Sequence, residues 1–142
     1  HQKAGLRDAA AKLYQETLEN DFGLYMAHVR LAEIHEAHQS WTPAITERRL
    51  AVEANPEDFS LRLDLAITQA KGGRVDDAML EFEQAAVMQP RDPRPHYFMG
   101  LLHQMKNAQE EARGSLTEFL ALAPARFAPQ IRDAQNRLET LR

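Results

Sequence analysis

Six histidines are the residues in this 142-residue chain with the clearest capacity for chemistry. His35 and His38 lie three residues apart in the stretch HEAH, close enough on one helix face to share a metal ion. The zinc-protease helix needs two residues between its glutamate and its second histidine, and HEAH has only one. His28 and His35 would lie roughly 10 Å apart along a helix axis, too far to share one ion. We therefore expect no metal site.

The other reactive residue types also lack the sequence context that catalysis requires. The glycines of KGGR indicate a turn rather than a phosphate-binding loop, and Ser40, Ser60 and Ser115 have no nucleophile-elbow sequence around them. The chain contains no cysteine, which excludes disulfides, thiol chemistry and cysteine–zinc sites. We predict that this segment is not an enzyme and uses no cofactor. A cysteine-free chain fits a cytoplasmic, a periplasmic and an extracellular location equally well.

Composition and charge limit the classes of partner that the chain could bind. Hydrophobic residues make up 44% and charged residues 27% of the chain, as in folded soluble proteins. The net charge is −4, with acids and bases mixed, and the basic stripe typical of nucleic-acid binding is missing. No apolar run of about 18 residues is present, so we expect no membrane insertion.

The strongest pattern in the chain is a fixed period that several residue types share. Pro56, Pro90 and Pro124 are evenly spaced, since 90−56 = 34 and 124−90 = 34. A period of about 20–50 residues is typical of stacked supersecondary units. Two columns of small residues, one column of large apolar residues and one column of aromatic residues keep the same period. They are Ala10, Ala44, Ala78 and Ala112; Ala32, Ala66, Gly100 and Ala134; Leu31, Leu65 and Met99; and Tyr25, Phe59 and Phe127.

Each period predicts a helical hairpin. In 59–92, apolar residues at helical spacing run up to Gly72 and Gly73, which favour the left-handed turn that ends a helix. Asp76 is the expected N-cap of a second helix, and Pro90 prevents that helix from continuing. The small residues of the repeating columns let the two helices cross closely.

With these features the chain resembles the tetratricopeptide repeat family, whose unit is a helical hairpin of about 34 residues. The match runs through VRLAEIHEAHQSWTPAITERRLAVEANP, LRLDLAITQAKGGRVDDAMLEFEQAAVMQP and HYFMGLLHQMKNAQEEARGSLTEFLALAP. The resemblance implies an all-α fold, a right-handed α-solenoid of stacked antiparallel hairpins. We predict a single solenoid over 1–142, with the second helix of a truncated repeat in 1–24, full repeats in 25–58, 59–92 and 93–126, and a closing helix in 127–142.

Three residues depart from the repeat pattern. Phe22 stands where the first half-repeat should have its proline. Arg48 occupies a column that Phe82 and Leu116 hold in the later repeats, and Phe119 replaces an alanine. We expect these residues to loosen or bend the array locally.

In this family the first helices of successive repeats line a concave wall, and the resemblance implies a peptide-binding groove there. An apolar band with a charged rim suits an amphipathic helix or an extended apolar peptide. Alternatively, the array's own closing helix or the missing N-terminal part of the first repeat would partly cover this band. The predicted groove residues are Val29, Glu33, Leu63, Ile67, Arg94, Tyr97 and Leu101.

The sequence therefore predicts a non-catalytic scaffold that binds a peptide or helix of a protein partner. One alternative is an accessory domain of a larger enzyme or of a secretion or assembly machine. A second alternative is self-assembly. Because the chain starts inside a repeat, Leu13, Tyr14 and Leu18 would present an uncovered apolar side through which copies could pair.

Overall fold

The structure is a computed structural model that describes Ala9 and residues 23–141. The predicted helix before residue 24 and the self-association through Leu13, Tyr14 and Leu18 lie outside the described residues. Within the described part there are seven α-helices and no strand. The elements are α2 (Leu24–Ala37), α3 (Trp41–Ala54), α4 (Phe59–Lys71), α5 (Val75–Met88), α6 (Arg94–Met105), α7 (Gln109–Leu122), the 3₁₀ turn η1 (Ala125–Phe127) and α8 (Ala128–Thr140).

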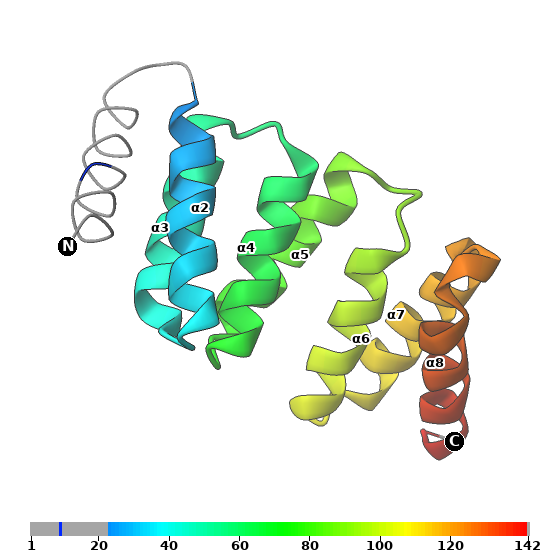
Figure 1. The fold of residues 1–142 in the computed structure, drawn as a ribbon. Coiled ribbons are helices and arrows are strands. Elements are labelled where there is room, and N and C mark those ends of the chain that lie inside the picture. The colour runs from blue at the N-terminus through cyan, green and yellow to red at the C-terminus, as the bar shows by residue number, and fades with distance from the viewer. Residues whose placement is uncertain (1–8, 10–22, 142) are drawn as a thin grey trace.

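Helices that follow one another in the chain pack as hairpins. The pairs α2–α3, α4–α5 and α6–α7 make the most extensive contacts, and α3–α4, α5–α6 and α7–α8 join each hairpin to the next element. Figure 1 shows α2, α4, α6 and α8 following one another along one side, with α3, α5 and α7 behind them. The fold is a right-handed α-solenoid, which confirms the all-α prediction.

The turn inside each hairpin has the same geometry in all three cases. Gln39, Gly73 and Asn107, which occupy the same position in successive repeats, have φ values of 55°, 82° and 59°. The amide that follows each of them donates to a carbonyl five residues earlier at 2.8 Å, so the helix carbonyls are satisfied in the same way each time. Asp76, expected as an N-cap, instead lies in the first turn of α5, whose N-cap is Arg74 without a side-chain bond.

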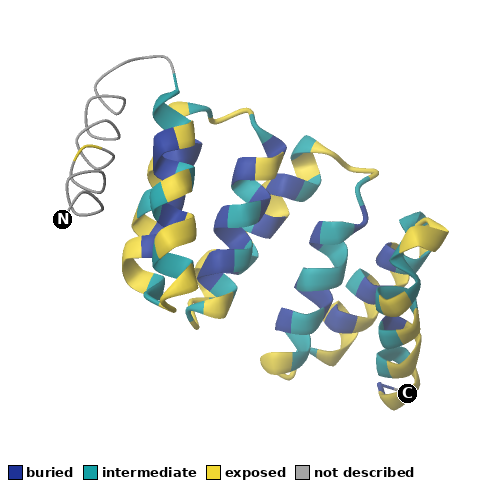
Figure 2. Cartoon of the chain, viewed as in Figure 1, coloured by how far each residue is buried: buried dark blue, intermediate teal, exposed yellow. Residues whose placement is uncertain are grey.

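Small residues permit the close helix crossings. Ala32, Ala66, Ala78 and Ala112 are completely buried. At Gly100 a Cβ atom would lie 2.6 Å from Cδ2 of Leu116, so α6 and α7 approach more closely there than an alanine allows. Figure 2 shows the buried positions on the sides that the helices turn toward one another, while the outer sides are exposed.

Of the three departures from the repeat pattern, two lie in the described part, and Phe22 does not. Arg48 is only 8% exposed and binds Glu36 with Nε–Oε1 and Nη2–Oε2 distances of 2.8 and 3.3 Å. The hydroxyl of Thr68 also donates to Glu36, at 3.2 Å. The charged side chain therefore joins α2, α3 and α4 where other repeats use apolar contact. Phe119 is 1% exposed and fills the core under α8.

Candidate functional site

The seven predicted groove residues lie on the three first helices of the hairpins. Glu33 is exposed, Leu63 is buried with 3% of its surface accessible, and the others are half-buried. Their helices share one side of the array (Figure 1). The positions are Val29 and Glu33 on α2, Leu63 and Ile67 on α4, and Arg94, Tyr97 and Leu101 on α6.

Leu63, Ile67, Arg94 and Tyr97 meet in one pocket, which we call the concave pocket. Its volume is about 310 Å³, near the lower end of the range of about 300–1,000 Å³ that is usual for ligand sites. Val29, Glu33 and Leu101 lie outside it. The remaining lining residues are Asp64, Phe98, Phe119, Phe127 and Gln130.

Aromatic rings form much of the wall of the concave pocket. The ring centroid of Tyr97 lies 5.8 Å from that of Phe98 and 5.0 Å from that of Phe119. Phe119 in turn meets Phe127 edge-on at 6.4 Å. The prediction of the groove missed these three phenylalanines. The sequence did single out Phe119, because its large ring occupies a position where the repeat pattern has alanine.

Helix α8, predicted as the closing helix, is hydrogen-bonded to α6 beside the concave pocket. The hydroxyl of Tyr97 donates to Asp133 Oδ2 at 2.5 Å, and Nε of Arg137 donates to the same oxygen at 2.7 Å. Arg137 also donates to Gln104 on α6, at 2.8 Å. Among the predicted groove residues, Tyr97 is thus in contact with α8. The helix leaves a pocket beside it, with Gln130 of α8 in its wall.

The bond between Tyr97 and Asp133 shifts the pKa of both groups. Burial and the hydrogen bond to Asp133 raise the pKa of Tyr97 to about 12. Burial also raises the pKa of Asp133, but the hydrogen bonds from Tyr97 and Arg137 outweigh it and hold this pKa below its usual value. Both shifts favour the bonded state, in which the phenol is neutral and the carboxylate is charged.

Replacing Tyr97 with phenylalanine should therefore remove a pH-dependent part of the stability. Because the pKa of the folded state lies above the ordinary 10.0, Tyr97 stabilises the fold fully below pH 10.0, and this contribution is lost as the pH rises to about 12. We expect the wild type to melt higher than the variant below that window, and the two melting temperatures to converge inside it. Thermal unfolding followed by circular dichroism measures this. A constant difference across the window would contradict the assigned bond.

Charges at the mouth of the concave pocket are mostly paired within the chain. Arg94 donates to both carboxylate oxygens of Asp92, at 3.0 and 2.8 Å, and its guanidinium lies 5.4 Å from the ring centroid of Phe59. The hydrogen bond from Arg94 holds the pKa of Asp92 below its usual value. Burial raises the pKa of Asp64, and the nearby Arg48 only partly offsets this. Arg94 is therefore less available to a ligand than its sequence position suggests.

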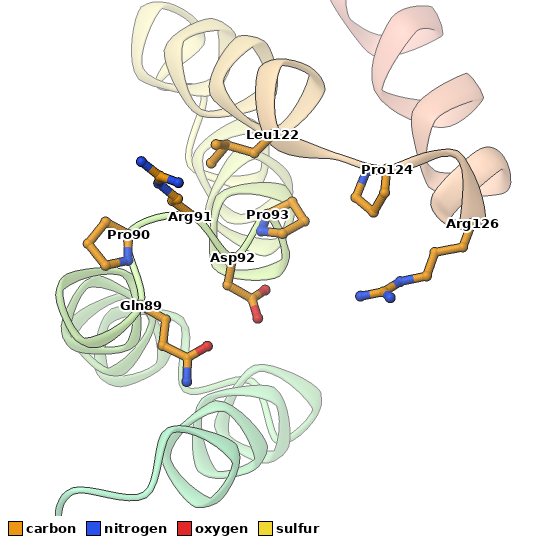
Figure 3. Close-up of a pocket in the computed structure, with 8 residues that line it drawn as sticks. All are labelled: Gln89, Pro90, Arg91, Asp92, Pro93, Leu122, Pro124 and Arg126. Carbon is orange, nitrogen blue, oxygen red and sulfur yellow. The ribbon is translucent and has the colours of Figure 1, made fainter.

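A second, larger pocket of about 680 Å³ lies where the α5–α6 turn faces the segment after α7. Figure 3 shows Asp92 and Arg126 extending toward each other across its opening. Its walls are mostly exposed turn residues, including the repeat-ending Pro90 and Pro124. The concave pocket, with its convergent aromatic side chains, is the better candidate for a binding site.

The described residues provide neither a metal site nor a membrane-spanning helix. No group of three or more histidine, aspartate or glutamate side chains in Ala9 and 23–141 is placed to hold a metal ion. His28 is buried and pairs with Glu47, with 2.6 Å between Nδ1 and Oε2, which ties α2 to α3. None of the helices in this described part is long and apolar enough to cross a membrane.

Comparison with known proteins gives one family and two similar proteins. A family model described as "Tetratricopeptide repeat" matches residues 1–58 and 49–95. The cytochrome c-type biogenesis protein CycH of Bradyrhizobium diazoefficiens is 34% identical over 98 residues, or 67% of this chain. The protein O-mannosyl-transferase Tmtc1 of Drosophila melanogaster is 30% identical over 88 residues, or 61% of this chain. The matched segments are only 27% and 10% of those proteins.

Among solved structures, the type III secretion chaperone SycD of Yersinia enterocolitica, in complex with a peptide of the translocator YopD, has a similar fold. The TM-score is 0.75, with 80% of this chain and 88% of that chain covered. The sequence identity is 19%, so this similarity concerns the fold.

Proposed function

Because the chain belongs to the tetratricopeptide repeat family, we propose that it is a non-catalytic protein-interaction scaffold that holds a peptide or helix of a partner in the concave pocket. The observation that carries this proposal is the convergence of aromatic side chains from α6, α7 and η1 on a pocket beside Ile67 of α4. Aromatic side chains dominate the energetics of protein interfaces. A hollow with such walls provides the anchor point that a peptide needs.

The surroundings of the pocket fit a peptide that continues along the array. Leu101 of α6 and Val29 of α2 are half-buried, and Glu33 is exposed, which supports the predicted apolar band with a charged rim beyond the pocket. A peptide anchored by one side chain would bury neighbouring apolar residues on this band. The similar fold of SycD, described as bound to a peptide, supports this use of the architecture.

A second candidate function is that of an accessory module in a larger enzyme or assembly machine. The matched segments form only a fraction of a biogenesis protein and of a transferase, and this favours the second candidate. In both candidates the segment itself binds a polypeptide and performs no chemistry.

A display library of short random peptides tests the proposal directly. We expect peptides selected on the wild-type chain to bind Ile67→Glu at least about tenfold more weakly, because the new carboxylate would stand in the apolar wall of the pocket. Affinity is measured by fluorescence anisotropy with labelled peptides, and circular dichroism verifies that the variant keeps its helicity.

The matched control is Leu80→Glu, which places the same charge on an exposed side chain of α5. Binding should be unchanged in this variant. Selected peptides that bind Ile67→Glu as tightly as the wild type would show that the concave pocket is not the binding site.

A further inference from the structure

We propose that Asp64 makes the concave pocket selective for a peptide that inserts a lysine or arginine side chain. The inference rests on the proposed function, because it names the chemistry of the ligand for the same pocket. Three features support it: the carboxylate of Asp64 has unused hydrogen-bonding capacity, the other charges nearby are paired, and the walls of the pocket are aromatic.

Asp64 lacks a close partner among the described residues. Its carboxylate accepts no hydrogen bond from any of them, and the nearest cationic atom is Nη1 of Arg48, 3.7 Å from Oδ2. The guanidinium of Arg48 makes its shorter contacts with the carboxylate of Glu36, at 2.7–3.3 Å. The Asp64 side chain is 48% exposed and lines the pocket, so an incoming donor can reach it.

The other charges near the pocket are already neutralised or lie elsewhere. Arg94 is bound to Asp92 by two side-chain hydrogen bonds. The charge of Asp133 is balanced by Arg137. Arg126 has its guanidinium 5.1 Å from the ring centroid of Phe127, but it is exposed and lines the larger pocket rather than the concave one.

The walls of the pocket favour a long cationic side chain over other anchors. The apolar stem of a lysine or arginine buries well against aromatic and aliphatic groups, and aromatic faces attract the cation. The charged end would then donate to Asp64 in a charge-assisted hydrogen bond. A purely apolar anchor would desolvate Asp64 without supplying a donor, and an acidic anchor would meet a like charge.

The test is a parallel selection of display-library peptides on the wild type, on Asp64→Asn and on Glu83→Gln. Glu83 is an exposed residue of α5, so its variant makes the same acid-to-amide change away from the pocket. Peptides selected on the wild type and on Glu83→Gln should share a lysine or arginine among apolar residues. Peptides selected on Asp64→Asn should keep the apolar residues and lose the basic one.

A measurement on the peptide itself covers the case in which Asp64→Asn misfolds. Replacing the shared basic residue with norleucine should weaken binding to the wild type by about tenfold or more, a result that needs no variant of the protein. If Asp64→Asn folds, the same replacement should weaken binding to it by far less. The inference is overturned if the selected peptides share no basic residue, if they share an acidic one, or if norleucine binds the wild type equally well. Peptides that bind Ile67→Glu as well as the wild type would instead overturn the proposed function, and this inference with it.

Discussion

Replacing Glu36 with alanine is expected to lower the free energy of unfolding by about 3–5 kcal/mol. Arg48 has a side chain only 9% exposed, and Glu36 supplies its close hydrogen bonds. Without Glu36, Asp64 at 3.7 Å is the one carboxylate left to the guanidinium among the residues that the structure describes, so the buried charge is poorly compensated. Because domains of this kind are stable by about 5–15 kcal/mol in total, the loss should be plain in urea denaturation.

The double variant Glu36→Ala with Arg48→Leu tests whether the lost stability comes from the uncompensated charge of Arg48 or from another effect of removing Glu36. Leucine is the residue that this column holds at Leu116, so the double variant should recover most of the lost stability. Glu33→Ala is the matched control, since its side chain is 52% exposed and should change stability by no more than about 0.5 kcal/mol. If Glu36→Ala costs no more than this control, the buried ion pair does not stabilise the junction of α2, α3 and α4.

Replacing Phe82 with alanine is the second large change, with an expected cost of about 3–5 kcal/mol. Phe82 is completely buried in the core between α4, α5 and α6, and its ring stacks on Phe98 with 5.2 Å between centroids. Truncation leaves a cavity at the centre of the array that the rigid helices cannot close. Urea denaturation again measures the change.

Leu80→Ala on the same helix is the control for Phe82→Ala. Leu80 is 63% exposed, so its truncation should change stability by no more than about 0.5 kcal/mol. Similar losses of stability in the two variants would mean that Phe82 is not part of the central core.

Loss of Phe82 should also weaken peptide binding, because its stacking partner Phe98 lines the concave pocket.

Sequence reasoning recovered the fold because its signals are local or strictly periodic. The columns of small residues at Ala44, Ala78 and Ala112 and the spaced prolines keep one common period, and each hairpin forms from neighbouring segments. The groove was predicted from the resemblance to the family, in which the first helices line a concave wall, and it stays a prediction. Four of the seven residues predicted for the groove line the concave pocket, which are Leu63, Ile67, Arg94 and Tyr97.

The details of the site depended on side-chain contacts that the repeat pattern does not specify. Arg94 looked like a free cation at the groove, but Asp92 pairs with it. Tyr97 looked like an open groove residue, but its hydroxyl is bound to Asp133, 36 residues later. Which donors and acceptors remain for a ligand is decided only when the helices are packed.

The sequence by itself determined the period, the helices and the small residues at their crossings, since these follow from local conformational preference and from repetition. Only the tertiary structure decided how departures from the repeat are accommodated. Gln39 and Asn107 adopt the left-handed conformation that Gly73 has, and in all three hairpins the next amide bonds back to the preceding helix. Arg48 is buried where leucine or phenylalanine stands in other repeats, because a glutamate on the neighbouring helix α2 meets its charge.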